Sequence, residues 1–438
     1  MVKEFEKYVM KRFFIVLGLL IVMGISTKAQ EQKDTILTLE QCVSLALQNN
    51  KKAHEAKNDM EAAIYLKREA FTKYFPEIAA LGMAFWANHD IVQYNILDLI
   101  ELGLIKRGNI AGIQALQPVF TGGLIINGNK LAGVAEEVSK IRKEQTDNEL
   151  RLATETFFWK LNTLEYSMKV IDSAIDFLDT LENQVKVMLD AGLITRNDLL
   201  KVQLKRNTYL SDKVDLQNGI QLVKMLLGQY MGLGVSGNFQ IVLSVPDYVP
   251  DLEFGMFIPS EQALSMTPDY KLLQKNVEAK KIERRMEIGS NLPTIMLGAG
   301  WYYHDLLKQN HNFGSLQLAI SVPLTGWWSG SYGIKRKNLE LLNAKNEMQD
   351  LSEKLQIEMQ DKWNNLTSAH RKMEIENEGI NQSKENLYLI KMNYEAGICT
   401  ISDLLEAETS LKEAEERFVS AFGEYKTSQA QYLIATGR

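Results

Sequence analysis

The stretch "YEAGICTISDLLEAE" (Tyr394–Glu408) decides the fold, because a close copy of it occurs earlier in the chain. The copy is "LDAGLITRNDLLKVQ" (Leu189–Gln203), and six of the fifteen aligned positions are identical. The two glycines, Gly192 and Gly397, lie 205 residues apart (397 − 192). A chain that repeats such a segment is predicted to contain two copies of one structural unit.

The prolines support the same division. Pro118 in "QPVFTGG" and Pro323 in "VPLTGWWSG" are also 205 residues apart (323 − 118). The sequence has no proline between Pro118 and Pro246 and none after Pro323. Because proline breaks helix interiors, both segments are free to form long helices. The second has the apolar spacing of a coiled-coil-like seam, through Leu341, Ala344, Met348, Leu351, Leu355 and Met359.

The repeated turn segments predict how each half is built. Each glycine can end a helix in the left-handed conformation. Capping-box spacing for a new helix follows, in Thr195 with Asp198 and in Thr400 with Asp403. We therefore expect two pairs of a long helix and a returning helix, over 124–190 with 196–230 and over 331–395 with 400–436. At 1.5 Å per residue each long helix would measure about 100 Å, which requires a coiled bundle or tube.

In the segment that precedes each long helix, apolar residues recur at every second position, which is the spacing of a strand and not of a helix. In 293–305 and 312–323 apolar side chains alternate with small or polar ones, and weaker counterparts occupy 77–89 and 109–119. Strands of this length match membrane-spanning strands. The alternative is a soluble hairpin that packs on one face. Trp327 and Trp328 follow the second pair, where an interfacial aromatic belt would lie.

Four strands do not close a barrel, and an open sheet edge is not tolerated in lipid. If these strands span a membrane, several protomers must share one barrel. The first repeat is placed at 31–230 and the second at 260–438. A connector rich in glycine and proline joins them over 231–259.

The N-terminus has the pattern of a secretory signal peptide. Lys11 and Arg12 precede an apolar run, Phe13–Ile25, and small residues follow it. We expect residues 1–30 to be removed, and Met10 would be a cleaner start than the first methionine. The alternative is a membrane anchor, for which the run is short.

Composition and spacing argue against several other classes. The chain has 438 residues, a formal net charge of −6 and no clustered basic charge, so nothing indicates nucleic-acid binding. The two cysteines are far apart, which makes a disulfide framework unexpected. His304 and His311 flank a predicted hairpin turn and are interpreted as loop residues, not metal ligands. Since no nucleophile–base pattern, metal spacing or cofactor loop is found, the sequence predicts no enzyme, no cofactor and no metal site.

Two halves, each with a leading helix, a strand hairpin, a long helix and a returning helix, resemble the TolC family of outer membrane efflux proteins. The residues that carry the resemblance are the two turn segments and "LTLEQCVSLALQNN" (Leu37–Asn50), "QPVFTGG" (Gln117–Gly123) and "SVPLTGWWSG" (Ser321–Gly330). The resemblance implies a mainly α fold with membrane β structure. In it a homotrimer forms one twelve-stranded β-barrel in outer membrane lipid, and a long periplasmic α-helical barrel continues from it.

The same resemblance implies a passive exit duct of a tripartite efflux or type I secretion system. Its partners would be a periplasmic adaptor (membrane fusion) protein and an inner-membrane transporter of the RND or ABC type. The alternative function is a soluble periplasmic coiled-coil adaptor or structural protein. That alternative does not explain two strand pairs placed symmetrically before the long helices.

The resemblance also places the turn segments at a gate, the periplasmic entrance. Asp403 and Glu406 match the acidic pair that rings the entrance, and Asp198 and Tyr394 match partners in the contacts that hold the tips closed. At Cys399 the best-known member has an arginine that pairs across the gate, which puts a salt-bridged closure in doubt here.

The residues themselves leave alternatives for this gate. Asp198 and Asp403 are also explained as helix caps alone. Glu406 has no capping role and shares a helix face with Asp403, while its equivalent in the first half is Lys201 (406 − 205). In a trimer the second-half pair would bring six carboxylates to one axis. Close like charges raise carboxyl pKa values and attract cations, so we hypothesise a cation-attracting acidic ring. For Glu406 the alternative is a solvated surface charge.

Overall fold

A computed structural model of the chain describes residues 36–438, except 90, 92, 97–99, 104, 236, 247, 253–254, 307–310 and 325. The expected signal peptide, residues 1–30, lies outside the described residues.

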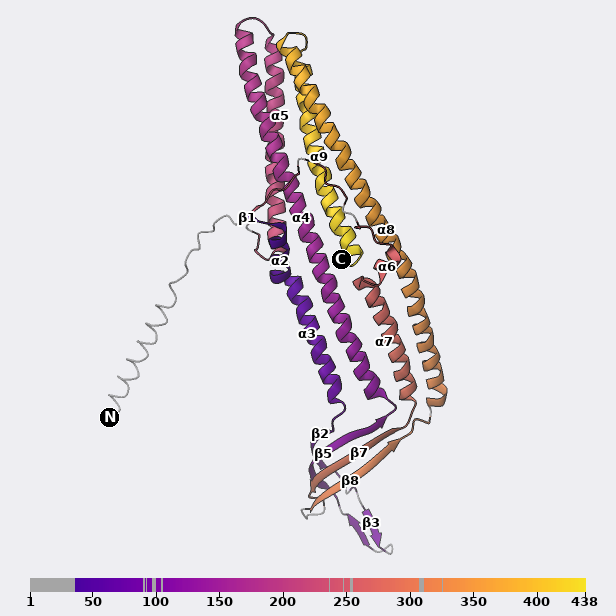
Figure 1. Cartoon of the computed structure of the whole chain (residues 1–438). Helices are drawn as coiled ribbons and strands as arrows, with labels where there is room; N and C mark the ends of the chain where they lie inside the picture. Colours follow the sequence, from indigo (N-terminus) through magenta and orange to yellow (C-terminus); the bar gives the residue numbers. More distant parts are fainter. Residues whose placement is uncertain are drawn as a thin grey trace, which may run out of the picture.

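Four long helices form an elongated column (Figure 1). They are α4 (Leu124–Asp190, 67 residues), α5 (Arg196–Tyr230, 35 residues), α8 (Gly326–Glu395, 70 residues) and α9 (Ile401–Ala435, 35 residues). α4 and α5 form one hairpin, α8 and α9 form the other, and α9 also packs on α4. Both tight turns lie at the same end of the column. α8 begins five residues earlier than expected (331 − 326), so Trp327 and Trp328 lie in its first turn.

Two shorter helices precede the strands in each half. The first half has α2 (Leu39–Asn49) and α3 (Lys51–Thr72), and the second has α6 (Ser260–Leu264) and α7 (Pro268–Ser290). Side chains of Thr38, Asn50 and Thr267 accept backbone N–H bonds at the starts of α2, α3 and α7. α3 and α7 both pack on α4, and α7 also packs on α8, so they extend the column toward the sheet.

An open antiparallel sheet lies at the other end of the column. Its strands are β2 (Glu77–Trp86), β5 (Arg107–Thr121), β7 (Thr294–His304) and β8 (His311–Ser321), in the order β2-β5-β7-β8. The strands of the two halves therefore meet at the β5–β7 pair. Within the described part of the chain β2 and β8 are the edges, so this one sheet does not close.

Two strand pairs were not predicted. β3 (Gln93–Ile96) and β4 (Ile100–Gly103) form a small hairpin in the segment between β2 and β5. β1 (Ile36–Leu37) pairs in parallel with β6 (Gln240–Ile241), which lies in the expected connector. The connector also contributes Phe239, Ile241 and Met256 to the main hydrophobic core, so it is a packed element as well as a link.

Two glycines set the junction between sheet and column. A Cβ on Gly122, whose φ is +62°, would lie 2.0 Å from the carbonyl oxygen of Gly289 at the end of α7. A Cβ on Gly289 would in turn lie 2.3 Å from the carbonyl oxygen of Gly122. Both distances are far below van der Waals contact, so only glycine permits this backbone approach. Gly122 of "QPVFTGG" is thus a requirement of the strand-to-helix turn.

One expectation for the sheet is wrong. His304 and His311 are not loop residues, because they are the last residue of β7 and the first of β8 and lie directly opposite each other. The ladder extends to them because every residue from Thr294 to His304 has a partner on β8.

Candidate functional site

The two tips of the helical hairpins have matching backbone structure. In the first, Gly192 has φ +73° and the N–H of Leu193 donates to the carbonyl of Met188 at 2.9 Å. In the second, Gly397 has φ +74° and the N–H of Ile398 donates to the carbonyl of Asn393 at 2.8 Å. Such a bond after a left-handed glycine satisfies the last carbonyls of a helix. The local sequence alone therefore determines both turns.

The predicted capping boxes are present at both tips. At the second tip, the N–H and hydroxyl of Thr400 donate to Oδ2 of Asp403 at 2.8 and 2.7 Å. At the first, the corresponding bonds from Thr195 to Asp198 measure 3.2 and 2.7 Å. The bond from each threonine hydroxyl is the main reason that the pKa of each carboxyl lies below its usual value. Both aspartates therefore act as caps, whatever further role they have.

Glu406 lies one turn beyond Asp403, and both side chains are exposed on α9. Between them, Leu404 and Leu405 point into the core that joins the hairpins, together with Leu181, Val185 and Val202. Within the described residues, the Glu406 carboxylate makes no hydrogen bond or ion pair. The structure thus gives Asp403 and Glu406 one exposed face, which is the local condition that an acidic ring requires.

Lys201 links the two hairpins. Its Nζ donates to Oγ of Ser402 at 2.9 Å and lies 3.7 Å from Oδ1 of Asp198. The charge of Lys201 also contributes to lowering the pKa of Asp403. Sequence reasoning noted Lys201 only as the position where the first half lacks an acid. No local pattern in the sequence indicates that it faces the second hairpin.

Tyr394 lies half-buried between the hairpins. Its hydroxyl donates to Sδ of Met188 at 3.9 Å, and burial followed by the Asp198 charge raises its pKa. The Tyr394 hydroxyl is thus hydrogen-bonded to Met188, and Asp198 affects the pKa of Tyr394 through its charge. Cys399 is partly exposed in the turn and is a free thiol.

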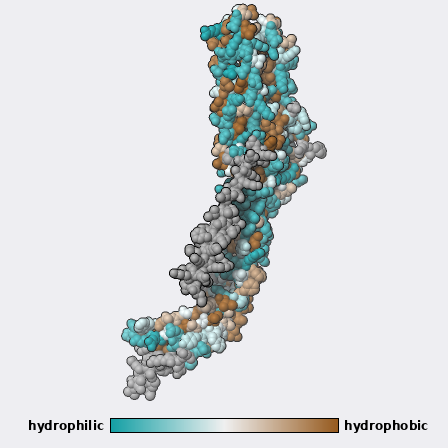
Figure 2. All heavy atoms as spheres, turned by 90° about the vertical axis from the view of Figure 1, so that its left-hand side faces the viewer, coloured by the Kyte–Doolittle hydropathy of each residue, from teal (hydrophilic) through white to brown (hydrophobic). Residues whose placement is uncertain are grey.

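The sheet at the opposite end has one exposed apolar face. Leu297 lies opposite Leu318, and Ala299 lies opposite Leu316. Leu316 and Leu318 are 77% and 63% exposed, and Ile113 on β5 shows 60%. The predicted alternation is therefore present, and the apolar side chains cover no core within the chain. Figure 2 shows that the surface of the helical column is, by contrast, a mixture of hydrophilic and hydrophobic residues.

Aromatic residues flank this face at two levels. Near the helices, Phe71 packs edge-to-face on Tyr74 and Phe75, and Trp328 is 75% exposed. The side chain of Trp327 lies outside the described part. Toward the far end, Trp86 and Trp301 are 88% and 63% exposed. The Phe71 cluster was missed because it lies outside the expected strands. Trp86 lies within the expected strand 77–89 but was not singled out, because the alternation there is weaker.

The strands have the length of a membrane crossing. β7 and β8 have 11 residues each, which gives about 36 Å when extended. A strand tilted by about 45° from the membrane normal spans roughly 25 Å of membrane thickness. This equals the height of the apolar band of a transmembrane barrel. Among the described helices, none is both long and apolar enough to cross a membrane.

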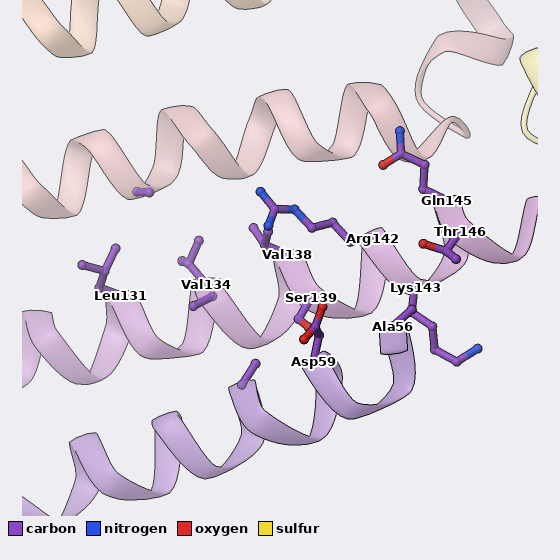
Figure 3. A pocket seen from close by; sticks show the side chains of 13 residues that line it. Ala56, Asp59, Leu131, Val134, Val138, Ser139, Arg142, Lys143, Gln145 and Thr146 are labelled. Atoms are coloured by element: carbon purple, nitrogen blue, oxygen red, sulfur yellow. The ribbon is translucent and has the colours of Figure 1, made fainter. Parts of the chain in front are cut away.

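A groove of about 580 Å³ lies among α3, α4 and α7 (Figure 3). Small residues such as Ala56 and Ser139 line it, and Arg142 and Lys143 extend in different directions. It does not gather a set of side chains suited to catalysis. In the part of the chain that the structure covers, no group of three or more His, Cys, Asp or Glu residues is arranged to hold a metal.

Comparisons with known proteins agree with the resemblance seen in the sequence. No protein-family model matches the chain. It is 20% identical over 451 residues to the outer membrane protein TolC of Salmonella enteritidis, a match that covers 98% of this chain and 86% of TolC. It is also 23% identical over 263 residues to the outer membrane efflux protein BepC of Brucella suis biovar 1 (strain 1330). That match covers 58% of this chain and only 55% of BepC.

Solved structures agree on the fold. The outer membrane protein VceC of Vibrio cholerae superposes with a TM-score of 0.76 at 14% identity, covering 91% of this chain and 96% of VceC. The outer membrane channel CmeC of Campylobacter jejuni gives 0.78 at 14% identity, covering 94% and 90%. The expected resemblance to TolC-type proteins is confirmed. These relatives are named as outer membrane, efflux and channel proteins, not as enzymes.

Proposed function

We propose that this chain, which has the fold of the TolC-type channels, is one protomer of an outer membrane exit duct. Three copies would form it and would conduct substrates passively from an inner-membrane transporter and a periplasmic adaptor to the outside. The sheet would lie in the outer membrane and the helical column would extend into the periplasm. No catalysis is part of this function.

The observation that carries the proposal is an open, apolar sheet attached to a column of paired hairpins. β2 and β8 present backbone N–H and C=O groups at the two edges of the sheet. In lipid such groups have to be paired. If β8 of one copy pairs with β2 of the next, three copies close a ring of twelve strands. Leu316, Leu318 and Ile113 then face lipid, which explains why they cover no core.

The hairpin tips suit contact with another protein. Leu193 and Ile398, the residues after the two turn glycines, are 72% and 75% exposed. Both lie at the extreme end of the column, so a partner that meets the column end-on would cover them. We assign this end to the adaptor. A soluble adaptor or structural protein is the weaker reading for the chain itself, because it would leave the apolar sheet face in water.

The test is ion conductance of the purified protein in planar lipid bilayers, with a pair of arginine substitutions in β8. Leu316→Arg places a charge on the apolar face. At the bilayer midplane this costs roughly 2–4 kcal/mol per copy, so channel insertion should be largely lost. Gln317→Arg changes the adjacent residue, on the opposite face of the sheet, and should insert as often as the native protein. Equal insertion by both variants, or no conductance by the native protein, would contradict the proposal.

A further inference from the structure

The far end of the β7–β8 hairpin brings two imidazoles together. His304 and His311 form the last cross-strand pair, and their ring centroids are 5.6 Å apart with an interplanar angle of 43°. The paired residues that precede them on β7 and follow them on β8 align the two side chains on one face. The sheet therefore places the two imidazoles next to each other.

The pair lies on the face of the sheet opposite the apolar one. Tyr302 and Phe313 are the next cross-strand pair on that face and stack at 5.4 Å. Phe313 also contacts the ring of His304, with centroids 6.0 Å apart. The stacked pair of Tyr302 and Phe313 therefore restricts the orientation of the His304 ring. In the proposed duct this face would line the lumen, and the histidines would lie near its outer mouth.

His304 has a buried nitrogen that the described residues leave without a hydrogen-bond partner. Its Nδ1 is inaccessible to solvent and makes no bond there. Buried polar atoms in folded proteins almost always have a partner, so an unpaired one requires an explanation, and a bound ion or water is one that fits two adjacent imidazoles. The neighbouring carboxylate does not supply it, because Asp305 accepts from the N–H and Nδ2 of Asn109 at 2.5 and 2.8 Å. Those bonds instead anchor the end of β7 to β5.

The ring separation fits a shared metal ion. Zinc binds imidazole nitrogen at about 2.0–2.1 Å, so two imidazoles on one ion have centroids roughly 5 Å apart. The observed 5.6 Å is close to this value. Each imidazole has a second nitrogen that remains available for a hydrogen bond while the first binds.

We propose that His304 and His311 together bind one divalent transition-metal ion. Imidazole suits Cu²⁺, Ni²⁺ and Zn²⁺, and affinity should follow the usual order with Cu²⁺ tightest. With two protein ligands the site stays open, and water or a passing ligand completes the coordination. Binding follows from the hairpin alone. Only the placement at the outer mouth of a duct rests on the proposed function.

The experiment measures Ni²⁺ binding by calorimetry to the full chain in detergent at pH 7.5, purified without a histidine tag. Ni²⁺ is chosen because it is not reduced by the thiol of Cys399. We expect about one Ni²⁺ per chain. His304→Ala and His311→Ala should each lose more affinity than the roughly 10–100-fold that loss of an outer-shell partner costs. His54→Ala, which removes an exposed histidine on α3, is the matched control and should bind like the native chain.

Two readouts keep the result interpretable. Circular dichroism and native mass have to be unchanged in the variants, so that lost binding is not lost folding. Ni²⁺ binding that persists in the His304→Ala, His311→Ala double variant would overturn the proposal, as would its absence in the native chain. A failure of bilayer conductance with this binding intact would instead count against the duct.

Discussion

At the scale of single residues, Asp403 and Glu406 differ in how each is held. Asp403 is fixed by two bonds from Thr400, and its pKa is lowered below the usual aspartate value. It therefore stays ionised throughout the neutral and mildly acidic range. Glu406 extends from the same face without such a restraint. Three copies around one axis would present this pair as a ring at the proposed entrance.

Replacing both acids with alanine should lower the preference of the channel for cations over anions and weaken block by multivalent cations. The reason is that fixed negative charge in a constriction concentrates cations. The measurement is the reversal potential in a salt gradient across a planar bilayer. Asp198→Ala is the control, because it removes the matching cap at the first tip but leaves the acid pair. An unchanged reversal potential in the double variant would reject the ring.

The tip residues illustrate what local sequence can predict. Gly397, Thr400 and Asp403 act within one turn of the chain, so their roles follow from a left-handed turn and a capping box. The contact of Lys201 with Ser402 joins residues 201 positions apart. It depends on how α5 packs against α9, which no local pattern specifies. The pairing of His304 with His311 was missed for a related reason, since the ladder extends beyond the alternating apolar residues that marked the strands.

At the scale of elements, Lys201 makes a polar contact at the tips, and we assign to it the role of holding the α4–α5 hairpin against the start of α9. Lys201→Ala removes the bond to Ser402 and the charge near Asp198 and Asp403. The tips should then separate more readily, so single-channel conductance should rise and closures should become shorter. Lys213→Ala is the control, because Lys213 pairs with Asp172 at 2.6 Å inside one hairpin. If both variants conduct like the native protein, Lys201 does not hold the tips.

A buried carboxyl on the same pair of helices has a pH-dependent effect. Glu408 is 4% exposed and accepts a bond from the hydroxyl of Tyr209 at 2.9 Å. Burial raises its pKa, although Lys205 and Lys412, which lie over the Tyr209 ring, and the Tyr209 bond act in the opposite direction. The charge of Glu415 raises it further. Its folded pKa thus lies above its unfolded value.

A raised carboxyl pKa contributes stability below the unfolded pKa, and that contribution is lost as pH rises through the folded pKa. Glu408→Gln keeps an acceptor for Tyr209 and cannot ionise. The variant should therefore unfold at a higher temperature than the native protein at pH 7.5, and the difference should shrink toward pH 4. Thermal unfolding followed by circular dichroism at both pH values measures this. A difference that is constant with pH, or one that grows on acidification, would show that folding does not raise the pKa of Glu408.

Element bounds were predictable where one period runs for many residues. α4 spans Leu124–Asp190, and the expected range was 124–190, because proline-free amphipathic sequence ends at a glycine turn. The short pairs were not predictable. β1 and β6 have two residues each and lie about 200 positions apart, and β3 and β4 occupy a segment that carries no clear alternation.

At the scale of the whole molecule, the two halves meet along the sheet and the column. β5 pairs with β7 at the sheet, and α7 and α9 pack on α4 in the column. One chain is thus a rod with an open sheet at one end and two apolar turn tips at the other. Neither end is complete alone, since the sheet has free edges and the tips expose Leu193 and Ile398.

The central claim is that three copies close one barrel in the outer membrane. Its most direct test is the native mass of the mature protein after cell fractionation, measured on the detergent-solubilised particle. The account predicts a particle of three chains, found with the outer membrane and requiring detergent. A monomer or dimer released with the soluble periplasm would contradict it. The strands would then not span a membrane, and the soluble adaptor would become the better description.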